Sequence, residues 1–107
     1  MRRLPAEWEP QSAVQLTFPH AGTDWAPVLP LVLPCFVKIA EAISRFEPVL
    51  IVCADSGEVK KLFSGIPPAN IYFVEANSND TWARDHGGIT VEVNGGHLIL
   101  DIVFNGW

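Results

Sequence analysis

The spacing of hydrophobic and polar residues along the chain predicts strands and helices in regular succession. Apolar residues at 36, 39, 40 and 43 recur with the helical period, so we expect a helix over residues 34–46 with Pro34 in its first turn. Runs rich in β-branched and aromatic residues predict three strands, at residues 13–18, 49–54 and 71–75. The middle run is apolar throughout, which is typical of a strand buried on both faces.

Two further segments complete the pattern. Asp55, with Glu58 three residues later, resembles a capping box and predicts a short helix over residues 56–63 that ends before Gly65 and Pro67-Pro68. After a polar loop at 77–88, the alternating run 89–93, a turn at Asn94-Gly95-Gly96 and a returning run at 97–104 predict a hairpin. The order indicates an α/β chain with a mixed sheet and no internal boundary within residues 1–107.

Composition and charge restrict the class of protein. Seven basic and twelve acidic residues give a net charge of −5, so no basic stripe is available for nucleic acid or an anionic membrane surface. Hydrophobic residues make up 49% of the chain and charged residues 18%, which excludes a disordered polar tail. We expect no apolar run to approach the ~20 residues that span a bilayer, and residues 1–10 lack the apolar core of a secretory signal. These features predict a soluble, cytoplasmic protein.

Cysteine and histidine give little sign of a metal or redox site. Cys35 and Cys53 have no neighbouring cysteine partner, so we interpret both as core residues rather than redox or zinc ligands. A metal site remains an alternative, although the spacing of its candidate residues matches no ligand pattern; they are His20, Asp24, His86 and His97. We therefore expect no metal and no cofactor.

One loop collects most of the side chains that could carry chemistry. Residues 79–88 read Asn-Asp-Thr-Trp-Ala-Arg-Asp-His-Gly-Gly. Carboxylates accept hydrogen bonds from a planar guanidinium, and a tryptophan face can stack on the cation, so the loop predicts recognition of a planar cationic ligand. The alternative is structural. In that interpretation Arg84 pairs with Asp80 or Asp85, and Trp82 lies in the core.

Three ordered motifs carry a resemblance to a known family. The first is the run at residues 79–87. The second is the opening Pro-Ala-Glu-Trp-Glu-Pro-Gln-Ser-Ala at residues 5–13, with Phe18-Pro19-His20 after it. The third is Leu100-Asp101 with Phe104-Asn105-Gly106-Trp107. In this order they resemble the agmatine deiminase and Porphyromonas-type peptidylarginine deiminase family.

The resemblance implies both a fold and a reaction. The family has the pentein fold, an α/β propeller of ββαβ modules with pseudo-fivefold symmetry, of which this chain would be the first module and part of the next. Its members hydrolyse a guanidino group to a ureido group and release ammonia, without a metal or organic cofactor. A cysteine thiolate attacks the guanidinium carbon to give a thiouronium intermediate, a histidine shuttles protons, and acidic residues hold the substrate nitrogens.

The resemblance also assigns site residues. Asp85 matches the substrate-binding, catalytic aspartate, and Trp82 matches the tryptophan that helps to enclose the guanidinium. Further motif positions are expected to shape the loop or support the pocket, namely Asp80, Arg84, Asn105 and Trp107. The chain departs from the family pattern at Gly88, where proline is usual, and at Ile102-Val103, where Phe-Gly is usual.

Family chains are several times longer, and their catalytic histidine, a further acid and the nucleophilic cysteine lie in later modules. We therefore interpret residues 1–107 as the N-terminal fragment of a deiminase domain, inactive alone. The preferred substrate is agmatine, converted to N-carbamoylputrescine and ammonia in putrescine biosynthesis. The alternatives are peptidylarginine or arginine as substrate, or a non-catalytic binding fragment. Exposed edges are expected to contact the remaining modules or to mediate self-association.

Overall fold

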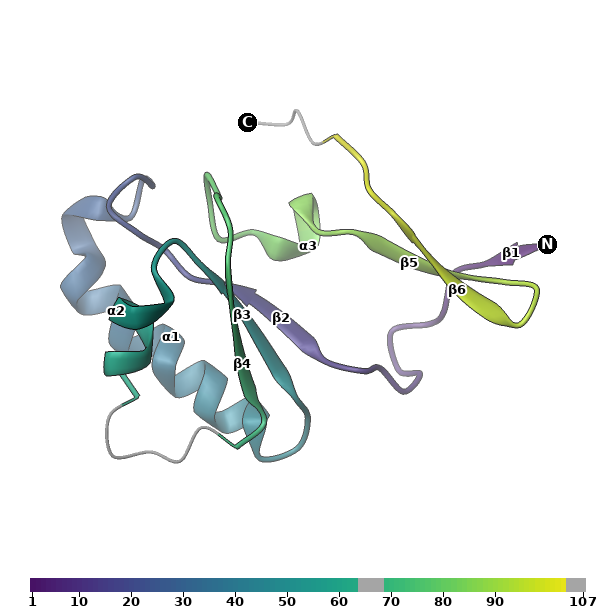
Figure 1. The fold of residues 1–107 in the computed structure, drawn as a ribbon, viewed down its shortest axis with the longest axis horizontal. Coiled ribbons are helices and arrows are strands. Elements are labelled where there is room, and N and C mark those ends of the chain that lie inside the picture. Colours follow the sequence, from purple (N-terminus) through teal and green to yellow (C-terminus); the bar gives the residue numbers. More distant parts are fainter. Residues whose placement is uncertain (64–68, 104–107) are drawn as a thin grey trace. The chain divides into compact units, whose positions relative to one another are not determined.

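The computed structural model describes residues 1–63 and 69–103, which form two compact units (Figure 1). One unit is Ser12–Thr81. The other combines Met1–Gln11 with Trp82–Trp107, so that it contains both ends of the chain. The helix stop expected at Gly65 and Pro67-Pro68 lies outside the described residues.

A three-stranded parallel sheet forms the centre of the unit Ser12–Thr81. Its strands, in sheet order, are β2 Val14–Thr17, β3 Val49–Cys53 and β4 Ile71–Glu75. All three confirm the expected strands. β3 is hydrogen-bonded on both sides, but its burial alternates: Val49, Ile51 and Cys53 are buried, whereas Leu50 and Val52 are half-buried. The expectation of burial on both faces therefore holds for one face of β3 in the described residues.

Helices connect these strands, and the first α-helix begins earlier than the sequence predicts. The 3₁₀ helix η1 Ala26–Val28 leads into α1 Leu29–Ser44, so the predicted start at Pro34 is wrong. Pro30, and not Pro34, occupies the first turn, where a backbone N–H has no helical partner. Pro34 lies inside the helix. The shorter helix α2 Ser56–Lys61 is capped as predicted, because the Asp55 side chain accepts from the Glu58 N–H at 3.1 Å.

Both helices contribute to a core on one face of the sheet. Its buried residues are Phe18, Val37, Ala40, Val49, Ile51, Cys53, Val59, Phe63 and Ile71. α1 enters this core through Val37 and Ala40, whereas Ile39, which the periodicity places inward, is 46% exposed. Val37 and Ala40 are three residues apart and so share one side of the helix, with Phe36 beside them. Of the predicted stripe, Phe36, Ala40 and Ile43 therefore pack in or against the core, and Val37 takes the place expected for Ile39.

The opposite face of the same sheet is apolar along β3 and β4, whereas β2 contributes Gln15 and Thr17 to it. Strand register places Leu50, Val52, Tyr72 and Val74 on it, because side chains alternate along each strand. Tyr72 is 59% exposed and Val74 44% exposed. Among the described residues, the sheet is thus covered by helices on one face only.

The helical run Ala26–Ser44 contradicts the expectation that no apolar segment approaches the length needed to span a bilayer. It has 19 residues with a mean hydropathy of 1.8, which is long and apolar enough to cross a membrane. A single such helix is weak evidence for a span, because core helices share these properties. Here Val37 and Ala40 join the core cluster with β3.

An antiparallel sheet organises the other unit. Its strands, in sheet order, are β1 Arg2–Arg3, β5 Ile89–Val93 and β6 Gly96–Leu100. The hairpin is confirmed: Asn94 and Gly95 form the turn with φ of 50° and 81°, as two-residue hairpin loops require. β6 ends at Leu100, earlier than expected, and β1 has no counterpart in the prediction. The chain is α/β, but residues 1–63 and 69–103 form two separate sheets instead of one mixed sheet.

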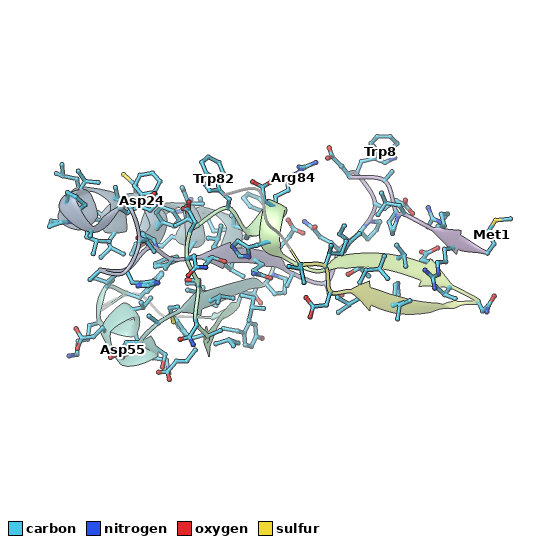
Figure 2. All side chains as sticks on the ribbon, turned by 90° about the horizontal axis from the view of Figure 1, so that it is seen from above. Met1, Trp8, Asp24, Asp55, Trp82 and Arg84 are labelled. Atoms are coloured by element: carbon cyan, nitrogen blue, oxygen red, sulfur yellow. The ribbon has the colours of Figure 1, made fainter. Side chains whose placement is uncertain are left out.

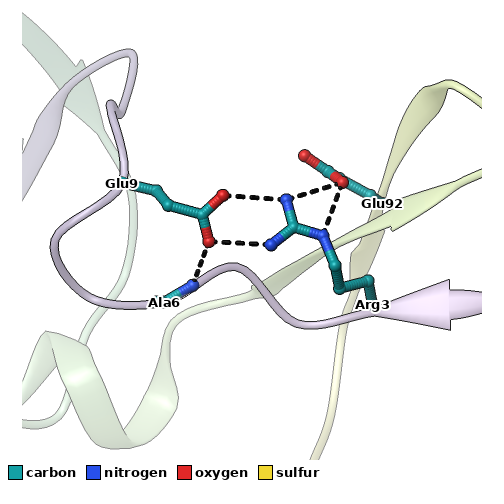
Figure 3. A network of polar contacts seen from close by, with 4 residues as sticks. All are labelled: Arg3, Ala6, Glu9 and Glu92. Atoms are coloured by element: carbon teal, nitrogen blue, oxygen red, sulfur yellow. Dashed lines mark hydrogen bonds and ion pairs between the residues drawn. The ribbon is translucent and has the colours of Figure 1, made fainter.

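Arg3 links the opening segment to this hairpin (Figure 3). Its guanidinium donates to both carboxylate oxygens of Glu9 at 2.8 Å, and its Nε donates to Glu92 at 2.9 Å. The Ala6 N–H donates to the same Glu9 carboxylate. Hydrogen bonds from Arg3, and then from Ala6, lower the pKa of Glu9 from its ordinary value of 4.5 to about 2. The opening segment is therefore tied to β5 through one bidentate arginine.

Candidate functional site

The chemistry-bearing loop contains a short helix, α3 Ala83–His86, in place of the fully irregular loop that the sequence predicts. Backbone N–H groups of Asp85 and His86 donate to the Trp82 carbonyl at 2.9 and 3.2 Å, which closes one helical turn. The Gly87 N–H donates to the Ala83 carbonyl at 2.7 Å and ends the turn. The central residues of the motif are therefore held on a single turn in the unit that contains the chain termini.

Residue 87 must be a glycine because the Ala83 carbonyl lies too close to leave room for a side chain. A Cβ at this position would lie 2.5 Å from the Ala83 carbonyl oxygen, so a side chain would force the helical turn to open. Gly88 is similarly close to a side chain, since its Cβ would lie 2.5 Å from Ile99 Cγ2. The glycine in place of the usual proline thus allows β6 to approach the end of α3.

Asp85 and Trp82 are both open to solvent. Trp82 is 58% exposed, so the alternative in which it lies in the core is wrong (Figure 2). The Asp85 side chain is exposed and makes no hydrogen bond or ion pair within residues 1–63 and 69–103. An ionised carboxylate is an acceptor-only group with about four lone-pair sites. Asp85 is therefore able to accept hydrogen bonds from a cation that carries several N–H groups.

Arg84 pairs with Glu7, a partner that nothing in the sequence indicates. Its guanidinium forms an ion pair with Glu7, from the opening motif, and not with Asp80 or Asp85. Hydrogen bonding to Glu7 raises the pKa of Arg84, and the charge of Asp85 adds a smaller effect in the same direction. This pairing leaves the Asp85 carboxylate without an arginine partner. Glu7 lies within the quoted opening motif, but no local spacing connects it to Arg84.

Asp80 belongs to the other compact unit, Ser12–Thr81. Its Oδ1 accepts from the Thr81 N–H at 2.7 Å and from the indole Nε1–H of Trp25 at 3.4 Å. Asp80 is half-buried, and its expected role in shaping the loop stays a prediction. The structure thus gives Asp80 a partner, Trp25, that the sequence offered no means of predicting.

The remaining predicted residues divide between the two units and the undescribed end. Trp82, Arg84 and Asp85 lie together around α3 in one unit, and Asp80 lies in the other. Asn105 and Trp107 lie outside the described residues, so their predicted support of the pocket stays a prediction.

The two cysteines differ in environment. Cys53 is buried, as expected, but Cys35 is exposed on α1 and is not a core residue. Burial, followed by the charges of Glu75 and Asp55, raises the pKa of the Cys53 thiol, which disfavours the reactive thiolate. Within the described part of the chain, no group of three or more His, Cys, Asp or Glu residues could hold a metal ion.

The fold and the motif together resemble an α/β segment of the deiminase class of hydrolases. The profile of the Porphyromonas-type peptidyl-arginine deiminase family matches residues 3–107, and the chain belongs to this family.

Individual relatives agree with this assignment. Agmatine deiminase of Pseudomonas aeruginosa strain LESB58 is 35% identical over 106 residues, which cover 98% of this chain and 28% of that protein. A cysteine-to-serine variant of C. jejuni agmatine deiminase, solved with substrate bound, superposes with a TM-score of 0.90 at 33% identity; the match covers 100% of this chain and 31% of that one. A Porphyromonas gingivalis protein provisionally assigned as an arginine deiminase has a TM-score of 0.85 and 50% identity, covering 100% of this chain and 32% of that one.

The chain therefore spans about a third of the length of the relatives that it matches. Over that span it reproduces their mixed α/β structure, which is part of the pentein fold.

Proposed function

We propose that this chain supplies the substrate-binding part of a guanidino-group deiminase, with Asp85 accepting hydrogen bonds from the guanidinium and Trp82 covering its plane. The observation that carries the proposal is the open carboxylate of Asp85 beside an arginine that is held elsewhere, by Glu7. If Arg84 paired with Asp85, the guanidinium site would already be filled by the protein's own cation. Family membership supplies the reaction class.

The proposed reaction converts agmatine and water to N-carbamoylputrescine and ammonia. Asp85 orients the guanidinium so that its central carbon faces a thiolate, and Trp82 adds a stacking interaction with the cation. The thiolate comes from outside these 107 residues, because Cys53 is buried with a raised pKa and Cys35 lies on α1. The chain alone is then expected to bind weakly and to show no turnover.

Arginine or peptidylarginine is the second candidate substrate. It is favoured by one observation: the P. gingivalis protein assigned as an arginine deiminase is 50% identical, whereas the agmatine deiminases of P. aeruginosa and C. jejuni are 35% and 33% identical. The guanidinium that Asp85 would bind is common to all of these substrates. The choice among them therefore depends on groups that contact the rest of the ligand.

The uncovered sheet face supports the proposal that the chain works within a larger assembly. Leu50 and Val52 with Tyr72 and Val74 form an apolar face on a sheet whose other side is covered by helices. Burial of such a face is favourable, at ~25 cal/mol per Å² of apolar surface. Further modules of a deiminase domain would cover it. In their absence, self-association through this face is expected.

A chimeric enzyme tests the proposal directly. Residues 1–107 replace the aligned segment of the P. aeruginosa agmatine deiminase, and ammonia and N-carbamoylputrescine are assayed with agmatine, arginine and an arginyl peptide. We expect turnover that falls on the order of 100-fold in Asp85→Asn, as when one preorganised transition-state contact is lost. Asp24→Asn, an exposed aspartate in the other unit, is the matched control. Unchanged turnover in Asp85→Asn would remove Asp85 from the site, and a folded but inactive chimera would favour the non-catalytic alternative.

A further inference from the structure

Two loops at the carboxyl ends of β2 and β4 are joined by a pair of side chains. The His20 Nε2 lies 2.9 Å from the backbone oxygen of Ser78, and the Trp25 Nε1–H donates to Asp80 Oδ1 at 3.4 Å. Both connections lie within the compact unit Ser12–Thr81. His20 and Trp25 thus each contact one residue of the loop 78–81, which precedes Trp82 in the sequence.

The bonding of the His20 ring identifies its tautomer. The Gly22 N–H donates to Nδ1 at 3.0 Å, so Nδ1 is an acceptor and the ring proton is on Nε2. The Nε2–H is then the donor that the Ser78 carbonyl requires. A Cβ at Gly22 would lie 2.9 Å from Cε1 of the ring, so a side chain there would displace the imidazole. The ring is therefore held from both of its nitrogen atoms.

The loop that presents these donors is itself well anchored. The Thr23 hydroxyl donates to the His20 carbonyl at 2.8 Å, and Thr23 is 7% exposed. The Thr23 N–H donates to the same carbonyl at 3.0 Å. β2 ends at Thr17, so the turn that carries the imidazole and the indole follows the carboxyl end of an edge strand of the parallel sheet. The turn that contains His20 and Trp25 is thus held by two hydrogen bonds from Thr23 to the His20 carbonyl.

The two acceptors, the Ser78 carbonyl and the Asp80 carboxylate, lie in the loop that directly precedes Trp82. Asp80 Oδ1 accepts from both Trp25 and the Thr81 N–H, so the carboxylate connects the indole to the peptide that precedes Trp82. Trp82 is covalently next in the chain and its carbonyl begins α3. Asp80 and Thr81 are therefore the last residues of the unit Ser12–Thr81 before the segment that carries Trp82 and Asp85 begins.

We propose that His20 and Trp25 are positioning residues that fix the loop 78–81, which directly precedes Trp82 in the chain. Neither side chain needs to contact the substrate in this role. Its importance for catalysis rests on the proposed function, whereas its effect on the loop does not. The imidazole donates through Nε2 to the Ser78 carbonyl, and the indole donates through Nε1 to the Asp80 carboxylate.

Hydrogen–deuterium exchange of the 107-residue chain, followed by mass spectrometry of its peptides, tests the proposal. Trp25→Phe keeps the ring but removes the donor, with Trp8→Phe, at an exposed tryptophan, as control. His20→Leu removes the contact to Ser78, and His20→Gln restores a side-chain N–H at an equivalent position; His97→Leu is the control. Loss of a hydrogen bond to a charged group is expected to raise exchange in 79–82 about tenfold in Trp25→Phe.

The pattern of exchange decides the outcome. Faster exchange confined to 79–82 in Trp25→Phe and His20→Leu, with recovery in His20→Gln, supports the proposal. Unchanged rates, or equal acceleration throughout β2, β3 and β4, would overturn it, because the two side chains would then be irrelevant to the loop or serve the fold as a whole. The same samples with agmatine, against putrescine as control, give a second readout. If agmatine protects no peptide of the unaltered chain, the proposed function is contradicted while the exchange rates still decide the positioning role.

Discussion

The guanidinium of Arg84 forms an ion pair with the carboxylate of Glu7, a residue 77 positions earlier in the chain. The pair joins the opening motif to the turn that carries Asp85. Both side chains are mostly exposed, so the pair is screened by solvent and salt and adds little to overall stability. Its consequence is local: the cation next to Asp85 in sequence is directed toward another acid.

Glu7→Gln tests this local role. We expect faster amide exchange in α3 at low ionic strength and little change in the unfolding midpoint. At about 1 M salt, where the Debye length is ~3 Å, the variant and the unaltered chain should converge. Asp24→Asn, which removes an exposed charge from the other unit, controls for net charge. A difference that persists at high salt would mean that Glu7 acts through packing instead of through its charge.

The Arg3–Glu9 contact predicts acid sensitivity of the opening segment. The folded-state pKa of Glu9, about 2, lies below its ordinary value of 4.5. Its contribution to stability is therefore present above pH 4.5 and is lost as the pH falls toward 2. Glu9→Gln should abolish the change in amide exchange of β1 between these two pH values.

Glu58→Gln is the matched control, because Glu58 pairs with Lys61 on an exposed helix in the other unit. It should leave the pH dependence of β1 unchanged. An undiminished acid transition in β1 of Glu9→Gln would show that another carboxylate controls the segment.

Ile51 lies at the centre of the core and has no exposed surface. Ile51→Ala should lower the free energy of unfolding by about 2–5 kcal/mol, because it removes buried methyl groups and leaves a cavity. Leu31→Ala, at a position of α1 that is 74% exposed, should change it by less than about 0.5 kcal/mol. Urea denaturation of both variants makes the comparison. Equal losses would mean that the exposed side of α1 is covered in solution.

Elements with strong local signals could be predicted from the sequence. The apolar runs of β2, β3 and β4, the Asp55 cap and the Asn94-Gly95 turn all follow from period, capping chemistry and the preference of Gly and Asn for positive φ. The family and its Trp-Ala-Arg-Asp motif were also identifiable from residue order.

Features that depend on distant partners could not be predicted in this way. β1 exists because Arg2 and Arg3 pair with Val93 and Glu92, about 90 residues later, and its own sequence is polar. The same limit applies to the Trp25–Asp80 bond, which connects two loops. The start of α1 was misplaced for a different reason: two prolines, Pro30 and Pro34, compete for the first-turn position, and only the first occupies it.

The two cysteines provide a test of where the nucleophile lies. Iodoacetamide should alkylate exposed Cys35 readily at pH 8, whereas Cys53, which is buried and has a raised pKa, should react at least ~10-fold more slowly, from opened molecules only. Denaturant should make the two rates equal. Because Cys35 lies on α1 and not within the motif, Cys35→Ser should leave protection of residues 79–87 by agmatine unchanged. Fast alkylation of Cys53 in the folded chain, blocked by agmatine, would instead place this thiol at the substrate site and contradict a nucleophile supplied from outside the chain.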